Sequence, residues 1–462
     1  MAPPQASSIP GRLLKALQSI NSSAPRLIAS PTAVGSNANP GASRRASVAI
    51  IIRLRPEDSP PGGNAASPTS SAAASASTSP FAQALPLPGS PTVAAAAAAT
   101  SEVSASDKAA YPPAQKDVKQ QLERFFEQDW VKRPGTTAEI LFIKRATRAT
   151  DKWSGHVAYP GGRHEPDDED SRYTAMRETW EEVGLDLAED DYLSVGALDD
   201  REITTSLGKR LLMILSPHVF LYTSPETPVP ELQESEVASA HWIPIDLLTA
   251  PAARYDSVSV DISTRLAPKN AFARAALKLL VGGMQFKCIL LPNEPIATGA
   301  LPSPQAVVPN APLKLWGLTL GMTLDLLSSM SLPTDAAASK GSTKSGDLST
   351  YPHAVAALPQ DKGALFAPSM ASIFPRFSYP DINALIWIFG FRYRRTLKQS
   401  PTDSARVNWA GMSIGSYYAA VRRALVVAVV LRALTALGGL GWLGWTLRKR
   451  LQSRRTARAL AL

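Results

Sequence analysis

Three glutamates, Glu178, Glu181 and Glu182, stand at positions i, i+3 and i+4 of one short stretch of the chain. If that stretch is helical, this spacing places all three carboxylates on one face of a single turn. Like charges so close repel each other, and the arrangement costs helix stability unless a cation neutralises it. A solvated acidic face is the simpler interpretation of three glutamates alone. The chemical interpretation is a hard divalent cation such as Mg²⁺, which prefers oxygen ligands.

The neighbouring residues predict the helix that such a site requires, over Ser171–Val183. Short polar and acidic residues before it are suitable N-caps and favour the positive end of a helix dipole: Asp167, Asp168, Asp170 and Ser171. Gly184 is typical of the residue that ends a helix. Apolar or small residues recur at helical spacing and can pack inward: Ala175, Met176, Thr179 and Val183. A Gly-rich loop at Gly161–Gly162 precedes the helix.

The stretch Gly161–Leu187 resembles the sequence box of the Nudix hydrolases. That box reads glycine, five residues, glutamate, seven residues, then R-E, an apolar residue, any residue, E-E, any residue, glycine and an apolar residue. Here Glu169 is followed, after seven residues, by RETWEEVGL at positions 177–185. Two positions depart from the pattern. Six residues, not five, separate Gly162 from Glu169, and Thr179 replaces the aliphatic residue.

The longer loop resembles that of the coenzyme A pyrophosphatase branch, whose pattern is F-P-G-G-[RK]-x-[DE]-P-x-D. This chain reads YPGGRHEPDD at positions 159–168, and residues 143–146 and 155–157 also resemble that branch. The stretch 147–154 is one residue longer than the branch's upstream signature. The resemblance implies hydrolysis of a diphosphate linkage in a small nucleoside diphosphate derivative, with coenzyme A or its esters favoured. Nucleotide sugars and dinucleotides are the alternative substrates.

The resemblance also implies roles for the box residues. Glu178 and Glu182, one turn apart, are the expected ligands of Mg²⁺ or Mn²⁺, with the Gly162 carbonyl completing the shell. Glu181 would hold another metal ion or its water, and it is one of several carboxylates that could act as the base. Arg177 is expected to pair with Glu169 or a box carboxylate and so to hold the catalytic group together.

Three residues outside the box are further candidates. Glu236, in the segment ESEV before a predicted strand, resembles a loop glutamate that some Nudix enzymes use as base or ligand. Arg145 and Arg163 could bind substrate phosphates. Each of the three has a plain surface residue as its alternative. His156 and His164 flank the loop, but their spacing does not indicate a zinc site.

The pattern of the chain indicates an α/β class, and the resemblance implies a Nudix-type α/β/α sandwich with a mixed sheet. Strands are expected at Ser47–Arg53, Thr137–Ile143, Gly155–Tyr159, Leu211–Tyr222 and Ala238–Ile243. Besides Ser171–Val183, helices are expected at Asp117–Phe126, Ile245–Thr249, Ala271–Leu280 and Leu318–Leu327.

We expect four parts in the chain. Residues 1–43 form an N-terminal segment whose helix, Ile9–Ile20, is either a mitochondrial-type targeting sequence or the first helix of the domain. The hydrolase domain covers 44–330 and carries a disordered insertion, rich in Ala, Ser and Pro, at about 56–110. A low-complexity linker, 331–375, leads to a basic tail, 376–462.

Charge and hydropathy indicate a membrane rather than a nucleic acid as the large partner. The net charge of +9 arises in the tail, where residues 376–462 carry +13 and the rest of the chain −4. Within it, Ala424–Leu447 is apolar except for Arg432 and two threonines, and basic residues flank both ends. As a helix of about 36 Å it could span a bilayer.

We therefore expect an intracellular, membrane-associated enzyme, with the mitochondrion or peroxisome as candidate compartments. The oligomeric state is left open. The lone Cys288 allows no intramolecular disulfide. Two other functional classes compete: a catalytically silent Nudix binding module, and a membrane adaptor whose tail is its main function. The intact set of three glutamates argues against the first, because their repulsion serves no purpose without a metal.

Overall fold

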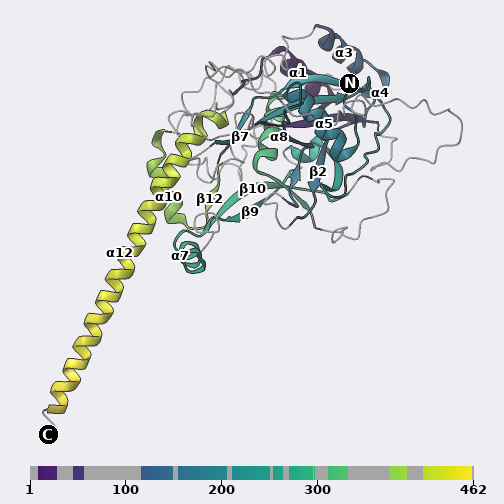
Figure 1. Cartoon of the computed structure of the whole chain (residues 1–462). Coiled ribbons are helices and arrows are strands. Elements are labelled where there is room, and N and C mark those ends of the chain that lie inside the picture. Colours follow the sequence, from purple (N-terminus) through teal and green to yellow (C-terminus); the bar gives the residue numbers. More distant parts are fainter. Residues whose placement is uncertain are drawn as a thin grey trace, which may run out of the picture.

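A computed structural model shows a body of two sheets with helices, from which one long helix projects (Figure 1). It describes residues 9–28, 45–56, 116–148, 154–204, 211–249, 253–263, 270–294, 296, 311–330, 374–392 and 409–459. The predicted insertion at about 56–110 and the predicted linker at 331–375 lie almost wholly outside these residues, so both remain predictions.

The larger sheet is mixed and has eight strands, with the order β3-β2-β1-β7-β5. Its central strand, β1, runs parallel to β7, pairing Ala46 with Leu215, and antiparallel to β2, pairing Ile52 with Ile140. Three shorter or outer strands complete it: β4 pairs with β1, β6 with β7 and β8 with β2. The strands are β1 Arg45–Arg55, β2 Thr137–Arg145, β3 Val157–Ala158, β4 Gly161–Arg163, β5 Tyr192–Ala197, β6 Arg201–Thr204, β7 Leu211–Tyr222 and β8 Val237–Pro244.

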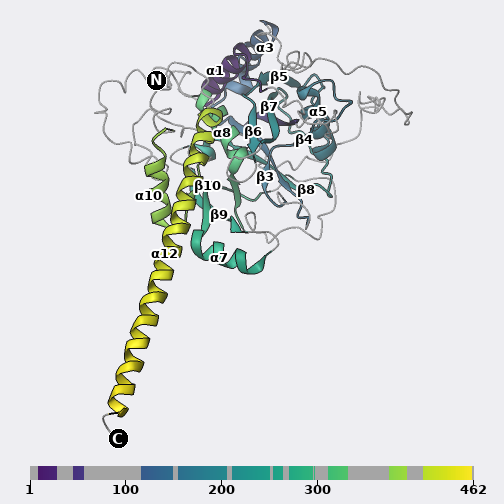
Figure 2. The ribbon, with the colours of Figure 1, turned by 60° about the vertical axis from the view of Figure 1, so that its left-hand side comes forward.

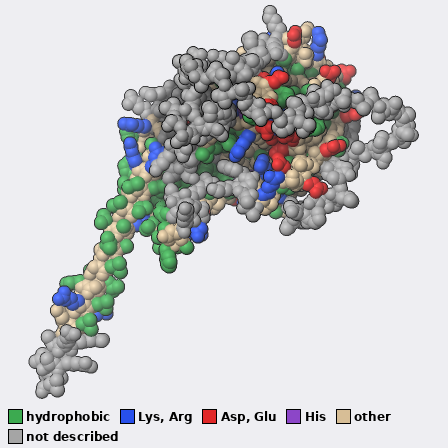
Figure 3. All heavy atoms as spheres, in the orientation of Figure 1, with side chains coloured by type: hydrophobic (Ala, Val, Ile, Leu, Met, Phe, Trp, Pro, Cys, Tyr) green, Lys and Arg blue, Asp and Glu red, His purple; other side chains and the backbone are tan. Residues whose placement is uncertain are grey.

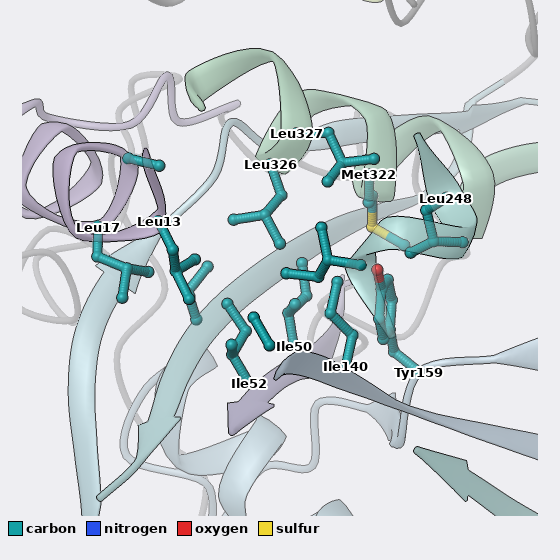
Figure 4. Packing of buried hydrophobic residues seen from close by; sticks show 14 of the residues in the cluster. Leu13, Leu17, Ile50, Ile52, Ile140, Tyr159, Leu248, Met322, Leu326 and Leu327 are labelled. Carbon is teal, nitrogen blue, oxygen red and sulfur yellow. The ribbon is translucent and has the colours of Figure 1, made fainter. Parts of the chain in front are cut away.

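Side chains of β1 alternate between the two faces of this sheet, and helices cover both. Ile50 and Ile52 face one layer of helices, formed by α1 Ile9–Ser22, α3 Lys116–Phe126 and α8 Gly317–Ser329. Figure 4 shows Leu13 and Leu17 of α1 and Leu326 of α8 meeting these isoleucines. The helix predicted at Ile9–Ile20 is thus packed into the core, as a first helix of the domain would be.

The opposite face of the sheet is covered by α5 Ser171–Val183. Ala49 and Ile51 of β1 lie in a second buried cluster with Ala175 and Val183 of this helix. Because burying a strand on both faces requires a nearly continuous apolar run, the segment VAIIIRL of β1 suits its central position. The predicted α/β/α sandwich with a mixed sheet is confirmed.

A second, four-stranded sheet was not predicted. It has the order β11-β10-β12, with β9 also paired to β10. The strands are β9 Arg254–Asp261, β10 Gly283–Leu291, β11 Leu313–Trp316 and β12 Arg376–Phe377. Three helices accompany it: α7 Ala271–Val281, α10 Pro380–Phe389 and α12 Trp409–Ala459. They form a third buried cluster that includes Ile262, Val281, Phe377 and Ile382. The tail of the chain therefore packs on the body before α12 leaves it.

The boundaries of the remaining predictions differ from the structure in two places. The predicted strand Gly155–Tyr159 is reduced to β3, because Gly155 adopts a positive φ of 72° in a turn. The predicted helix Ile245–Thr249 is a short 3₁₀-helix, η4 Ile245–Leu248, which ends where Thr249 becomes extended. One more short helix, α4 Asp129–Lys132, follows α3. The other predicted strands and helices are confirmed, most within one or two residues.

Candidate active site

Helix α5 carries the candidate site, and its two ends are fixed by local chemistry. At the start, the Asp170 carboxylate accepts a hydrogen bond from the backbone N–H of Tyr173. At the end, Gly184 adopts a left-handed φ of 69° and its N–H donates to the Trp180 carbonyl. These caps satisfy backbone groups that a helix end leaves without partners, and they set where the three glutamates lie.

The Gly-rich loop reaches the site as β4, which pairs with β1. Gly161 lies opposite Val48, and its backbone N–H donates a hydrogen bond of 2.9 Å to Glu182 Oε2. Its φ of 146° suits glycine alone, and a Cβ here would lie 2.2 Å from the Ser47 carbonyl oxygen. The glycine therefore lets the backbone itself bind the carboxylate.

Gly162 allows the Glu178 side chain to approach the backbone of β4 closely. A Cβ at Gly162 would lie 2.3 Å from Glu178 Oε2, far inside van der Waals contact. The structure thus brings Gly162, Glu178 and Glu182 together where the strand meets the helix. That neighbourhood is the one in which the sequence predicts a metal site.

Arg177 is the hub of the carboxylate cluster. Its guanidinium donates to both oxygens of Asp168, at 2.8 and 3.0 Å, and to the Arg163 carbonyl at 3.0 Å. It also contacts Glu181 at 3.1 Å and Glu178 at 3.3 Å. The expected pairing with a box carboxylate is therefore present.

In the loop, the partner of Arg177 is Asp168 and not Glu169, which is exposed. Asp168 is buried and is held in turn by the Glu165 N–H at 2.9 Å and the Thr174 hydroxyl at 2.9 Å. The sequence predicts for Asp168 only a place among the residues that can cap the helix. The available signal was its place in the loop, since Asp168 occupies the final aspartate position of the F-P-G-G-[RK]-x-[DE]-P-x-D pattern.

Burial sets the charge state of two glutamates when no cation is bound. It raises the pKa of Glu182, which is only 2% exposed, to about 8, against the Gly161 hydrogen bond and the Arg145 charge, which lower it. It raises the pKa of Glu178 to about 7, against the charge of Arg177. For Asp168, burial is outweighed by the hydrogen bonds of Arg177, Glu165 and Thr174, which lower its pKa. Asp168 is therefore stable as an anion. The ionised forms of Glu178 and Glu182 would be stabilised by a bound cation, because burial disfavours their negative charge.

The candidates outside the box lie around this cluster at different depths. Arg145 Nη1 is 3.5 Å from Glu182 Oε1, so it belongs to the site. Glu236 contacts Arg148 at 3.2 Å and is near enough for its charge to raise the pKa of both Glu178 and Glu182. Arg163 contributes its carbonyl to Arg177, while its side chain is exposed.

The oxygen atoms of the box carboxylates suit a hard divalent cation, but their side chains do not converge on one point. In the described part of the chain, no three Asp, Glu, His or Cys side chains surround a common point as ligands would. The box carboxylates are instead neutralised by arginine at 3.1–3.5 Å, longer than the usual 2.7–2.9 Å of charge-assisted hydrogen bonds. Contacts this loose are ones that a cation could replace, and all the donors are oxygens.

The two histidines near the loop contact other side chains of the protein. His164 Nδ1 lies 2.8 Å from the Thr174 hydroxyl, and His156 packs edge-on against Trp316. A hollow beyond the end of α5 is lined by Trp180, Tyr192 and Tyr222 and by three acids, Asp186, Glu189 and Asp191. No box carboxylate lines it, and its acids would repel a diphosphate.

Comparisons with known proteins identify the same segment. The family model described as the NUDIX domain matches residues 131–262. An uncharacterized protein of Schizosaccharomyces pombe is 32% identical over 295 residues, which are 63% of this chain and 77% of that protein.

Two relatives have a named activity. The mitochondrial coenzyme A diphosphatase of Mus musculus is 39% identical over 14% of this chain and 32% of its own length. The peroxisomal coenzyme A diphosphatase of Caenorhabditis elegans is 36% identical over 23% of this chain and 42% of its own length. The chain thus matches less than half the length of either diphosphatase.

Among solved structures, the NUDIX domain of Shewanella oneidensis NrtR, complexed with ADP ribose, is similar with a TM-score of 0.22 and 11% identity. The match covers 45% of this chain and 79% of that one. A NUDIX hydrolase from Alicyclobacillus acidocaldarius gives a TM-score of 0.20 and 16% identity, over 51% and 90% of the two chains. Scores this low add nothing to the sheet order and layers described above.

Proposed function

Because this chain belongs to the Nudix hydrolase family, we propose that it cleaves the diphosphate linkage of coenzyme A or its esters, with Mg²⁺ or Mn²⁺ as cofactor. The observation that carries this proposal is the cluster on α5. Two glutamates, Glu178 and Glu181, and the buried Asp168 converge on Arg177, while the loop N–H of Gly161 donates to Glu182, the most buried of the three glutamates. On a helix with only a structural role, the repulsion between these carboxylates would lower stability without any compensating benefit.

Each residue can be given a task from its position. Glu178 and Glu182 would hold the cation, with the Gly162 carbonyl beside them. When bound, the cation supplies neutralisation of the diphosphate charge and a lowered pKa for an attacking water. Glu181 is exposed at the rim and would orient that water or accept its proton, a role for which Glu236 is the second candidate.

The arginines divide into two kinds. Arg177 donates hydrogen bonds to four residues of the protein, so its guanidinium would position the glutamates and would not contact the substrate. Arg145 is 28% exposed in its side chain, and Arg163 is more so; both would therefore bind substrate phosphates. On cation binding, Arg145 would be released from Glu182 and become available to the diphosphate.

The preference for coenzyme A rests on the loop and on the two relatives. The loop is one residue longer than the general Nudix pattern, as in the coenzyme A branch, and its Asp168 contacts Arg177. The two named relatives are coenzyme A diphosphatases. Nucleotide sugars and dinucleotides present the same linkage and are the second candidate class.

The test is a substrate comparison with the full chain in detergent micelles. With Mg²⁺ or Mn²⁺, coenzyme A and its esters should yield two phosphomonoesters faster than a dinucleotide or a nucleotide sugar. Glu182→Gln serves as the control that excludes contaminating hydrolases. Faster cleavage of a nucleotide sugar would move the proposal to the second class. Binding of these compounds without hydrolysis would favour a silent binding module.

We also propose that the protein works at an intracellular membrane through α12. By length and composition, Ser416–Gln452 of this helix could cross a bilayer, and it is the one such helix in the described residues. Figure 3 shows hydrophobic side chains along its projecting part. The mitochondrion and the peroxisome, where the two named relatives are placed, are the candidate compartments.

A further inference from the structure

Helix α12 has a docked part and an exposed part. Up to Ala428, one of its faces is buried against α7 and α10 through Tyr417, Val421, Ala424, Leu425 and Ala428. From Ala433 to Leu447 almost every side chain is exposed. In the first part of the predicted span, Ala424–Leu447, one face is therefore covered by the body, whereas Val426, Val430 and Leu431 on the other face are exposed.

Arg432 marks the boundary between the two parts. Its guanidinium donates to the Leu280 carbonyl at the end of α7 and to Asp381 of α10, at 2.5 Å from the carboxylate. It also lies 4.4 Å from the centre of the Tyr379 ring. The sequence placed this arginine inside the bilayer, but the structure pairs it at the edge of the body.

Beyond this boundary the apolar helix stands clear of the body on every side, but this part is short. Ala433–Leu447 would span only about 22 Å, at about 1.5 Å per residue. The hydrocarbon layer of a bilayer is about 30 Å thick. If α12 crosses the layer, the body must sink by roughly the missing 8 Å, and some part of its base must tolerate lipid.

Helix α7 has the surface for that contact. It lies at the foot of the body, beside the point where α12 leaves it (Figure 1, Figure 2). Phe272, Ala276 and Leu279 follow at i, i+4 and i+7, which is one helix face, and Phe272 and Leu279 are 90% and 74% exposed. A surface helix of a soluble body normally directs such a face inward.

The charges of α7 agree with a lipid surface. Lys278 is exposed beside the apolar face, and its Nζ is 3.9 Å from Asp261, so the pair is loose. Arg274 stands one turn before it on the same helix. Basic side chains next to an apolar face suit anionic headgroups, as in helices that lie in the membrane interface.

We propose that α7 is an interfacial helix, seated in the near leaflet with Phe272 and Leu279 among the acyl chains. Such helices bury their apolar face by about 5–10 Å, which matches the length that α12 lacks. Arg432 then fixes the angle between the seated helix and the inserted one. The base of the domain, and with it the distance of the α5 site from the membrane, is set by this contact.

A site-specific label tests the depth of α7. Cys288 is buried, so a cysteine introduced by Leu279→Cys can be labelled with an environment-sensitive fluorophore, with the parent chain as the blank. In vesicles of phosphatidylcholine and phosphatidylserine, emission should rise, shift to the blue and be quenched by shallow nitroxide lipids. A label introduced by Lys119→Cys, on α3 at the far end of the body, should show none of this.

Two results would overturn the proposal. One is a water-exposed Leu279→Cys label while the chain is bound to vesicles. The other is an apolar label signal without lipid in a chain that is dimeric, which would assign the face to a second copy.

Substitution provides an independent measurement. Phe272→Glu with Leu279→Glu should weaken vesicle binding at least about tenfold, because two large side chains lose their burial in lipid. Leu212→Glu, an exposed leucine on β7, is the matched control and should leave binding unchanged. Unchanged binding in the double variant would contradict the proposal. Hydrolysis in detergent should be normal in both variants, so this test rests on the proposed membrane role of α12 but succeeds or fails independently of the proposed hydrolysis.

Discussion

Helices α5 and α7 depart from an ordinary protein helix in opposite ways. On α5 a carboxylate, that of Glu182, is withdrawn from water and contacted by a backbone N–H and, loosely, by an arginine. On α7 a phenylalanine, Phe272, stands almost wholly in water. Both helices have well-defined caps, at Asp170 and at Asn270, so neither departure results from a badly formed helix.

This difference indicates which kind of partner would stabilise the surface of each helix. A buried carboxylate costs free energy until a cation or a proton neutralises it, and an exposed aromatic ring costs free energy until something apolar covers it. The α5 face therefore indicates a small, hard cation, and the α7 face an extended apolar phase. The predictions below test whether each helix responds to its own partner and not to the other's.

The largest effect should follow from Glu182→Gln. An amide keeps an acceptor for the Gly161 N–H but removes the charge, so hydrolysis should fall by more than the roughly 10–100-fold typical of partners one shell further from a metal. Vesicle binding should not change. Rates with Mg²⁺ are the measurement, and Glu165→Gln, an exposed loop acid, is the control. Near-normal turnover in E182Q would remove Glu182 from the site.

Asp168→Asn should be the next largest. The substitution removes the negative charge that pairs with Arg177, and both side chains are largely shielded from water. Removing one partner of a buried ion pair leaves the other charge without compensation, so the free energy of unfolding should fall by roughly 3 kcal/mol. Hydrolysis should drop about 10–100-fold, through displacement of Arg177 and the glutamates it contacts. Denaturant unfolding and steady-state rates measure the two effects. The adjacent, exposed Asp167→Asn should leave both unchanged, and equal losses in the two variants would contradict the assignment.

A smaller effect should appear when pH and metal are varied together. The pKa values of Glu178 and Glu182 are raised in the folded chain, to about 7 and about 8, so the folded state holds more protons than the unfolded state between their usual value and pH 8. With a chelator, these two groups should therefore make Tm fall as pH rises through that range, by a few degrees.

Mg²⁺ should reverse that fall. It competes with protons for the same oxygens, so its stabilising effect should be larger at pH 8 than at pH 6. The slope with chelator should be shallower in Glu182→Gln and unaltered in Phe272→Glu. An equal Mg²⁺ effect at both pH values would show that the cation binds elsewhere.

The smallest effect is expected at Thr179, where the sequence departs from the box. The Thr179 hydroxyl is buried and donates to the Ala175 carbonyl at 2.7 Å, so the polar atom is satisfied within the helix. Thr179→Val has nearly the same shape and should change stability by less than about 1 kcal/mol, with normal hydrolysis. Thermal unfolding is the check. A large loss would mean that the hydroxyl serves the site.

The elements that the sequence predicts correctly are those whose signals lie within the element or next to it. Helix α5 was predicted at both ends because its caps, Asp170 and Gly184, are neighbours of the residues they cap. Strand β7 was predicted because LLMILSPHVFLY is long and apolar. Strand β10 was not, since its partners β9, β11 and β12 come from three separate segments and only the folded chain brings them together.

The same limit applied to Asp168 and Arg432, on which the two proposals above depend. Asp168 lies nine positions from Arg177, and local spacing does not show that it, rather than Asp167 or Glu169, contacts the arginine. Arg432 sits in an apolar run, so hydropathy alone places it in lipid. Its contacts with Leu280 and Asp381 are 152 and 51 positions away along the chain.

The position of β1 has a consequence for how the protein is made. This strand is the centre of the large sheet, but its parallel partner β7 begins about 160 residues later in the chain. At roughly 5–20 residues per second, a ribosome needs on the order of 10–30 s to supply that partner. Throughout that interval the nascent chain carries the apolar run VAIII, from Val48 to Ile52, without its parallel partner strand. Co-translational chaperones that shield such segments should therefore govern how much of this protein reaches its native state.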